Sequence, residues 1–579
     1  MTPSEQRDFV LKNFKRLSSR QIAKKLDISR QEVEKIISEA KRQPLTKPAI
    51  EQGIPRSKEI FLIFGFFVLA LVLRLIYIHW LKATPFFEPL AKGLDDGVYH
   101  KMAQDISAGN WLGDLPYSAY RIPLYPYFLA VIYHFFGVSV GLVHVIQSLF
   151  GAFTPVLIYL ICKEVFKSQR TALIGGILAC FYAPFIFFEN LLLGESLSIF
   201  LNLSGLLVLL KGLNSEGKTV LKLIFSGLLF GVSILFRPNT IIPVCFLAVY
   251  VYFALGFLKK RHLKGLALSI IFLAASFLAV VPVTVKNYCL HKDFLPLSAV
   301  GGVNLYIGNN PEADGKFHLM KEIGTELNEM IKNSEVIAQR QLGRALKPSE
   351  VSAYWSKKAV NFALSSPGPF LALMAKKTAF FLNNYEFPDI LDIGFTSQFM
   401  PFLKLDLFGY GMIVVLGFCG IFLSWRQRNP SALLPGVFLA GYTLSVVLFF
   451  ITARYRLPAA PIFMIFAAFA VHELIDALRF WKSKELMSFA VVALVSGVVV
   501  FWPVETTRFG TNYNSLAVAL KNKGQYQEAE KYYRKAIEIE PDYPSPYYNL
   551  GLMYQKLGRR DEAEVIFRKY EEAKSKIRS

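Results

Sequence analysis

The amino-acid sequence predicts a mostly α-helical fold: a polytopic membrane bundle of about 11 transmembrane helices, with extracytoplasmic loops and a C-terminal pair of α-helical repeats. Hydrophobic residues make up 53% of the 579 positions, and charged residues make up 18%, against about 25% in an ordinary soluble protein. Apolar runs of membrane-spanning length recur along the chain. Near the C-terminus, one pattern of residues returns after 34 positions.

The first 58 residues are polar and basic, with 14 Lys/Arg and 7 Asp/Glu, and no apolar region opens the chain. A cleaved signal peptide is therefore not expected. Ser18 or Ser19 can cap a helix over 21–26, and Ser29 can cap a second helix over 31–40, which outlines a helix-turn-helix-like module. Because the module is short and tethered to a membrane, we expect a cytosolic contact or anionic-lipid role, with nucleic-acid binding through its basic residues as the less favoured alternative.

Eleven apolar runs follow the basic segment. They cover residues 60–80, 138–161, 171–188, 196–210, 220–236, 240–258, 265–285, 405–424, 433–451, 459–474 and 486–502. Lysines and arginines gather in five short loops that share a side with the N-terminus, so this side is expected to be cytoplasmic. With an odd number of spans in the inner (plasma) membrane, the C-terminus is expected outside.

These features divide the chain into four expected parts. The parts are a cytoplasmic helix-turn-helix-like module (1–44), a linker (45–59), a polytopic domain (60–504) with a first outer loop (81–137) and a large outer domain (286–404), and a repeat region (505–579).

The repeat region has the spacing of tetratricopeptide (TPR) repeats, which are paired helices of 34 residues. The recurring pairs are Leu516/Leu550, Ala517/Gly551, Gly524/Gly558, Ala529/Ala563 and Tyr533/Phe567. Two repeats are fewer than the ~3 usually needed for independent stability. We therefore expect them to pack on the membrane domain, on a second copy or on a protein partner, with a simple spacer as the alternative.

Chemistry is most readily expected in the first outer loop, where Asp95 and Asp96 are adjacent. In a helix Asp95 and Tyr99 stand i, i+4 on one face, so the phenol can orient the carboxylate. One carboxylate can then serve as a general base, and its neighbour can bind substrate or metal. An Asp-Asp-Gly sequence is also common in turns, which is the alternative for these residues alone.

Further motifs accompany the acidic pair in a fixed order. They are Gly109-Asn-Trp111, Tyr120-Arg-Ile-Pro-Leu-Tyr-Pro126, Glu189-Asn-Leu-Leu-Leu-Gly-Glu195, Phe236-Arg-Pro-Asn239, Gly302-Val-Asn-Leu-Tyr-Ile-Gly-Asn-Asn-Pro311 and Ala453-Arg-Tyr-Arg-Leu-Pro458. Over about residues 60–475 this order resembles the C-type superfamily of membrane glycosyltransferases. The branches that are most similar contain the protein O-mannosyltransferases and the lipid A aminoarabinose transferases.

The resemblance implies transfer of a sugar from a polyprenyl-phosphate donor to an acceptor hydroxyl on a protein or an envelope glycan or lipid. The reaction would take place outside, with inversion. Asp95 aligns with the family's catalytic aspartate, and Asp96 stands where many members have Glu. Tyr99 and four arginines at the outer boundary are expected to bind the donor phosphate, since a guanidinium can hold two phosphate oxygens. These arginines are Arg121, Arg237, Arg454 and Arg456.

Glu189 and Glu195 in the second outer loop are open to several roles: pairing with those arginines, contact with the sugar, or a share in a divalent cation site. The family's O-mannosyl and aminoarabinose branches are regarded as independent of metal. No obligatory cofactor is therefore expected, and a divalent cation is the alternative. Arg74, inside the first span, is expected to reach the membrane surface by snorkelling.

Two other functions compete with the glycosyltransferase. An envelope polysaccharide polymerase or ligase is expected to keep its key residues in a large later loop, whereas here the acidic pair lies in the first. A non-enzymatic transporter or repeat-bearing scaffold is expected to carry charges along a path in mid-membrane, whereas here the charges gather at the outer ends of the spans.

Overall fold

A computed structural model of the chain describes residues 9–10, 19–29, 31–34, 36, 55–89, 94–115, 118–214, 217–317, 323, 327–505 and 509–578. It separates into two units, residues 1–55 with 167–169 and the rest of the chain. In the first unit, α2 (Ser19–Leu26) is the first helix expected from the sequence. The Glu32 backbone N–H donates to Ser29 Oγ at 3.1 Å, as a cap at Ser29 predicts. The second expected helix lies only partly among the described residues, which are helical at 31–34.

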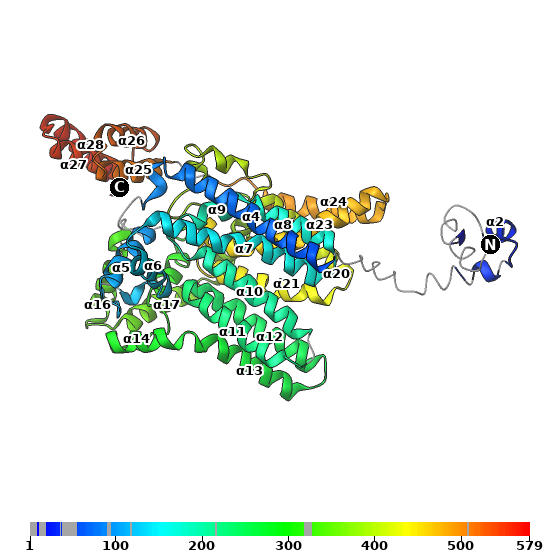
Figure 1. Ribbon diagram of the computed structural model, residues 1–579. Coiled ribbons are helices and arrows are strands. Elements are labelled where there is room, and N and C mark those ends of the chain that lie inside the picture. Colours follow the sequence, from blue (N-terminus) through cyan, green and yellow to red (C-terminus); the bar gives the residue numbers. More distant parts are fainter. Residues whose placement is uncertain are drawn as a thin grey trace. The chain divides into compact units, whose positions relative to one another are not determined.

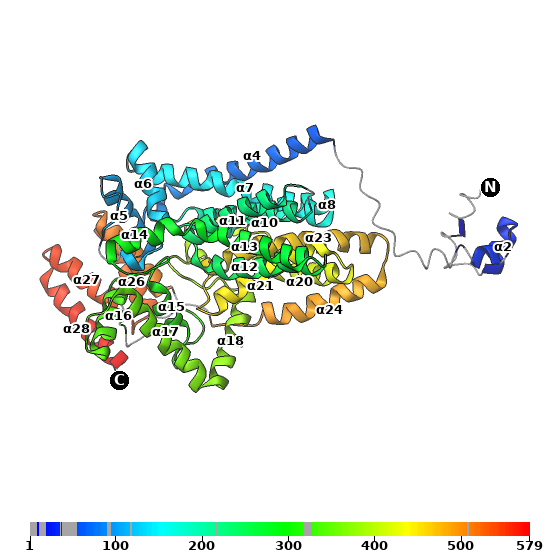
Figure 2. The same cartoon turned by 90° about the horizontal axis from the view of Figure 1, so that it is seen from below.

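The second unit contains the membrane bundle (Figures 1 and 2). In the described part of the chain, nine helical segments are long and apolar enough to cross a membrane, and two bent pairs raise the number to 11. The nine segments are Arg56–Leu81, Val140–Phe166, Glu195–Leu213, Thr219–Phe236, Pro238–Phe257, Pro401–Arg426, Pro430–Val447, Ala453–Arg479 and Ser483–Val500. The bent pairs are α8 (Gln169–Cys180) with α9 (Ala183–Glu189), and α13 (His262–Leu278) with α14 (Val281–His291).

All 11 apolar runs expected from the sequence thus appear as helices. The short run 196–210 is the middle of α10 (Glu195–Leu213), which has 19 residues. The two bends, of 51° and 44°, each come just before a helix with a proline in its first turn. Proline lacks the N–H that would continue the preceding helix, which accounts for a break at these points. The prediction of a polytopic α-helical bundle is confirmed.

The long connections carry shorter helices. The first connection folds as α5 (Asp95–Ser107) and α6 (Leu124–Phe136), which pack on each other. The second contains α15 (Val300–Gly308), α16 (Leu327–Leu342), α17 (Pro348–Ser365) and α18 (Pro367–Leu382). Trp355 of α17 is fully buried, and its indole N–H donates to the Ser334 carbonyl in α16 at 3.1 Å.

Four helices close the chain: α25 (Gly510–Asn522), α26 (Tyr526–Ile539), α27 (Pro544–Lys556) and α28 (Arg560–Arg578). They are the two helix pairs that the 34-residue spacing predicts. The Tyr513 hydroxyl donates to Gln398 Oε1 at 3.0 Å, and its ring meets Phe395 edge to face at 4.8 Å. The repeats therefore pack on the segment before α20 (Gly409–Arg426), which is the first of the three packing arrangements expected.

Candidate functional site

Asp95 is the first residue of α5, where its negative charge faces the positive end of the helix dipole. Its side chain is 26% exposed and is held by two arginines. Arg121 Nη1 donates to Oδ1 at 3.3 Å, and Arg454 donates to Oδ2 through Nη1 and Nη2, each at 3.2 Å. Tyr99, four residues further along α5, packs edge to face on Tyr125 at 5.6 Å. The Asp95 carboxylate is oriented by the guanidinium groups of Arg121 and Arg454.

Arg454 is the centre of the cluster. It lies in the short helix α22 (Ala453–Arg456), which begins where the Tyr455 N–H donates to Thr452 Oγ1 at 3.2 Å. Three carboxylates surround its buried guanidinium. Besides Asp95, Asp389 Oδ2 lies 2.7 Å from Nε and Glu195 Oε1 lies 3.3 Å from it, neither with hydrogen-bond geometry.

Arg237 and Glu195 form a second, buried pair beside Arg454. Arg237 follows the last residue of α11 (Thr219–Phe236), and Glu195 begins α10. Arg237 Nη2 donates to Glu195 Oε1 and to the Arg454 carbonyl, the latter at 3.4 Å. The guanidinium groups of Arg237 and Arg454 also lie 4.7 and 5.1 Å from the centre of the Tyr455 ring. We name the residues Asp95, Arg121, Glu195, Arg237, Asp389 and Arg454 the outer cluster.

Four buried polar atoms of this cluster, Glu195 Oε2, Arg237 Nε, Asp389 Oδ2 and Arg454 Nε, have no hydrogen-bond partner within the described ranges, although the last two lie within ion-pair distance of each other. A buried polar group without a partner costs about 1–3 kcal/mol. The cluster therefore has bonding capacity that the protein itself does not use, as expected of a site that takes a polar ligand.

Burial changes the ionisation of the acids here. Asp96 is 6% exposed, and its burial raises the pKa from the usual 3.8 to about 7, with a smaller contribution from the neighbouring Asp95 charge. The Gly97 N–H donates to Asp96 Oδ1 at 2.8 Å and acts in the opposite direction. Burial also raises the pKa of Asp389, against the attraction of Arg454. Two adjacent aspartates thus differ in environment: Asp95 is paired with two arginines, while burial raises the pKa of Asp96.

Glu189 lies outside this cluster, in an ion pair with Arg74. Arg74 Nε and Nη2 donate to the two carboxylate oxygens at 2.6 and 3.0 Å. The expectation that Arg74 snorkels to the surface is wrong: the side chain is fully buried, because the last residue of α9 presents a carboxylate inside the bundle. Gln147 fixes the same segment by donating to the backbone carbonyls of Glu189 and Leu191 at 2.6 and 3.0 Å.

Arg456 also lies in a separate network. Its guanidinium donates to the backbone carbonyls of Phe380, Phe381, Asn383 and Tyr385. It pairs with Glu386 at 3.0 Å and lies 3.9 Å from the centre of the Tyr410 ring. The structure thus brings together Asp95, Glu195, Arg121, Arg237 and Arg454 of the residues expected in the site, with Asp96 and Tyr99 on the same helix. It directs Arg456 to the end of α18 and the chain that follows.

Asp389 was not expected from the sequence. It lies in the irregular segment between α18 and α19 (Ile393–Thr396), where an acid next to a proline reads as an ordinary loop residue. No group of three or more His, Cys, Asp or Glu side chains able to hold a metal ion is found among the residues described. At the outer cluster the three carboxylates surround a guanidinium.

Comparison with protein families finds three matches. Residues 118–285 match the family described as dolichyl-phosphate-mannose-protein mannosyltransferase. Residues 519–558 and 544–576 match two tetratricopeptide repeat families. The resemblance to this class of membrane glycosyltransferases and the C-terminal repeats are confirmed. The mannosyltransferase match covers part of the membrane bundle, from residue 118 to residue 285.

Three further proteins are similar over longer or shorter parts of the chain. The oligosaccharyltransferase AglB from Archaeoglobus fulgidus, in complex with an inhibitory peptide and a dolichol-phosphate, is 14% identical over 81% of this chain and 60% of its own, with a TM-score of 0.41. ArnT from Cupriavidus metallidurans bound to undecaprenyl phosphate is 15% identical over 90% of this chain and 76% of its own, with a TM-score of 0.42. An uncharacterised protein of Methanocaldococcus jannaschii is 38% identical over 55 residues, which are 10% of this chain and 64% of that relative.

Proposed function

We propose that this protein is a membrane glycosyltransferase that moves a sugar from a polyprenyl-phosphate donor to an acceptor hydroxyl, with inversion at the sugar carbon. The observation that carries the proposal is the outer cluster, where Asp95 meets the guanidinium groups of Arg121 and Arg454. The first is 26 residues from Asp95 in the chain and the second 359 residues. A base beside a group of arginines is the pairing that this reaction requires.

Asp95 is proposed as the general base. Its carboxylate takes the proton of the acceptor hydroxyl while the acceptor oxygen attacks the anomeric carbon. The bond between that carbon and the phosphate oxygen breaks, and the electron pair leaves with the polyprenyl phosphate. Arginines are suited to the charge that builds on this phosphate, since each offers a planar fork of donors.

The charges of the outer cluster suggest how the donor is accommodated. Arg121, Arg237 and Arg454 face three acids, Asp95, Glu195 and Asp389, so each cation has a carboxylate beside it. We propose that the donor phosphate takes over the bonds of Arg121 and Arg454. Asp95 is then released from both and becomes free to accept a proton. Asp96, Tyr99 and the Glu195–Arg237 pair complete the walls of the proposed site.

The same proposal assigns the remaining parts. The outer cluster and the repeats (505–579) lie on the extracytoplasmic face of the inner membrane, and the helix-turn-helix-like module (1–44) lies in the cytoplasm. The donor lipid is bound from the membrane. The acceptor is a protein or an envelope glycan or lipid, and the repeats are available for a protein contact. No metal is assigned a role.

The test uses the purified full chain with a panel of polyprenyl-phosphate sugars and, in parallel, nucleotide sugars. We expect release of polyprenyl phosphate that depends on the chain and on an acceptor. Consumption of nucleotide sugars alone, or of none of the donors, would overturn the proposal. Mass spectrometry of envelope proteins and lipids from a deletion strain then identifies the acceptor and the sugar.

A further inference from the structure

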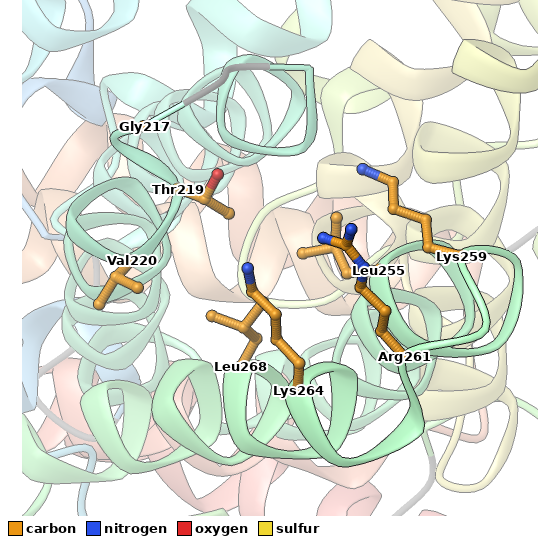
Figure 3. A pocket seen from close by; sticks show the side chains of 8 residues that line it. All are labelled: Gly217, Thr219, Val220, Leu255, Lys259, Arg261, Lys264 and Leu268. Atoms are coloured by element: carbon orange, nitrogen blue, oxygen red, sulfur yellow. The ribbon is translucent and has the colours of Figure 1, made fainter.

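A second site is indicated at the other end of α11, where the helix begins. A cavity of about 280 Å³ opens there between the start of α11 and the turn that joins η4 (Phe253–Phe257) to α13. It is lined by Gly217, Thr219, Val220, Leu255, Lys259, Arg261, Lys264 and Leu268 (Figure 3). Since α11 has 18 residues, the cavity is about 27 Å along the helix from Arg237, at 1.5 Å per residue. It is separate from the outer cluster.

The polar groups of this cavity carry one sign of charge. Lys259, Arg261 and Lys264 line it, and the lining residues that the structure describes include no acid. Among the described residues, none of these three cations makes an ion pair. Figure 3 shows the nitrogen atoms of Arg261 and Lys264 directed toward the opening that the Thr219 hydroxyl also borders. Three cations without an ion-pair partner border one recess, so they attract an anion that can contact several of them at once.

The backbone holds these cations in place. η4 is a π-helical turn, and the chain reverses after it with Lys260 in the left-handed region at φ 52°. The Arg261 N–H closes the turn on the Gly256 carbonyl at 2.8 Å. Gly256 and Gly265 touch backbone to backbone, because a Cβ at Gly265 would fall 2.2 Å from the Gly256 Cα. The cavity is therefore bordered by a close-packed turn, and its cations project from fixed positions.

The surroundings of the cavity are apolar. Leu263 is 85% exposed, Leu221 66% and Leu258 63%, and all three lie next to a lining residue in the chain. Leu221 and Leu263 lie in the first turns of α11 and α13, and Leu258 directly follows the span that ends at Phe257, so all three lie at span ends, where lipid headgroups meet acyl chains. A ligand that suits both features has a negative headgroup and apolar chains. Basic pockets between membrane helices bind lipid headgroups in this way.

We propose that this cavity binds the headgroup of an anionic phospholipid, with the phosphate on Arg261 and Lys264 and the acyl chains along the exposed leucines. Basic residues that gather on one side of the membrane orient the chain whether or not they line a cavity. Their presence in a cavity is therefore a separate observation. The loop between α23 (Ala460–Arg479) and α24 (Ser483–Val500) provides the comparison. Three exposed basic residues lie in this loop or at the helix ends beside it, Arg479, Lys482 and Lys484, and none of them lines the recess.

The experiment titrates the delipidated full chain in detergent with phosphatidylglycerol and with phosphatidylcholine of the same acyl chains, and follows bound lipid by native mass spectrometry. We expect one phosphatidylglycerol to bind at least ~10-fold more tightly than phosphatidylcholine. The triple variant Lys259→Gln, Arg261→Gln, Lys264→Gln should lose this preference. The matched variant Arg479→Gln, Lys482→Gln, Lys484→Gln should keep it. Equal binding of both lipids to the wild type, or an unchanged preference in the first variant, overturns the proposal.

Two further measurements complete the test. Excess inorganic phosphate is added to the lipid titration: displacement of phosphatidylglycerol at equal phosphate concentration would mean a site for a soluble anion and would also overturn the proposal. Should the triple variant fail to fold, a photoreactive phosphatidylglycerol is crosslinked to the wild type. We expect the label in the peptide covering 255–268, and label found only elsewhere contradicts the assignment.

Discussion

Arg454 donates to Asp95 through both terminal nitrogens, each 3.2 Å from Oδ2, although 359 residues separate the two in the chain. The pair joins α5 to the short helix α22, and therefore depends on the packing of the whole bundle. Arg121 holds the other oxygen of the same carboxylate at 3.3 Å. Three segments that are remote in sequence thus converge on one acid.

Replacing Asp95 by Asn should remove the proposed base and leave the shape of the site. We expect transfer from a polyprenyl-phosphate sugar to fall by about 10²–10⁴-fold, the usual contribution of a general base. Donor binding should stay near normal, because Arg121, Arg237 and Arg454 remain. The measurement is single-turnover transfer with the purified chain, together with donor binding at equilibrium.

The matched control for Asp95 is Asp105→Asn on the same helix. The Asp105 carboxylate faces solvent and pairs with Lys101 at 2.7 Å, remote from the arginines of the outer cluster. Its loss should leave transfer within about twofold, since surface pairs contribute little. Full activity in Asp95→Asn would rule out the base assignment. Activity lost only in Asp96→Asn would move that role to Asp96.

Arg454 and Arg456 are two residues apart and should respond differently to substitution by Lys. In Arg454→Lys a point charge replaces the fork that meets Asp95, so we expect the KM for the donor to rise by about tenfold with a small change in Tm. In Arg456→Lys the bonds to the carbonyls at and after the end of α18 are lost, and Glu386 is left short of a partner. We expect destabilisation of about 2–4 kcal/mol there and an unchanged donor KM. The opposite pattern would exchange their roles.

The sequence was sufficient for the elements of this fold and for part of the site. Apolar runs of fixed length predict spans because a bilayer imposes that length, and the 34-residue spacing predicts the paired helices. The partners within the bundle follow from three-dimensional packing, which the order of the residues does not reveal. Arg74 illustrates this, since its isolated position in an apolar run says nothing of Glu189, 115 residues later. Asp389 likewise gains its importance only from lying 2.7 Å from Arg454.

Gly151 makes room for the Arg74–Glu189 pair. A Cβ at this position in α7 (Val140–Phe166) would lie 2.2 Å from the Glu189 carboxyl carbon. Gly→Ala in a helix normally stabilises by about 0.5–1 kcal/mol. Here we expect Gly151→Ala to destabilise by about 3–5 kcal/mol, because it separates a buried ion pair.

The control is Gly436→Ala in α21 (Leu433–Val447), where a Cβ meets nothing within 4 Å. It should leave the Tm unchanged or raise it. Thermal unfolding of both variants in the same detergent provides the comparison. An equal or higher Tm for Gly151→Ala would show that Glu189 can move without cost.

The orientation of the chain can be tested by cysteine labelling in intact spheroplasts. The exposed native cysteines, Cys245 and Cys289, are first replaced by Ser. A cysteine at the exposed Gln555 of the repeats should react with a membrane-impermeant maleimide, whereas one at the exposed Ser483 should react only after lysis. Protection of Gln555→Cys until lysis would place the repeats in the cytoplasm and would exclude 11 spans with a cytoplasmic N-terminus.

The raised pKa of Asp96 makes a pH dependence of stability measurable. Between the usual pKa of 3.8 and the value of about 7 in the folded protein, the folded chain holds a proton that the unfolded chain has released. Raising the pH through this window therefore removes stability, at about 1.4 kcal/mol per pH unit, and the loss is complete above pH 7.

Asp96→Asn stays neutral at every pH and retains an oxygen for the Gly97 N–H. Its stability advantage over the wild type should be near zero at pH 4, grow to pH 7 and then level off. Unfolding curves of both proteins from pH 4 to pH 9, with Asp105→Asn run alongside as a variant that follows the wild type, measure this gap. A gap that is constant with pH, or that shrinks as the pH rises, would mean that Asp96 is ionised in the folded protein and that burial does not control it.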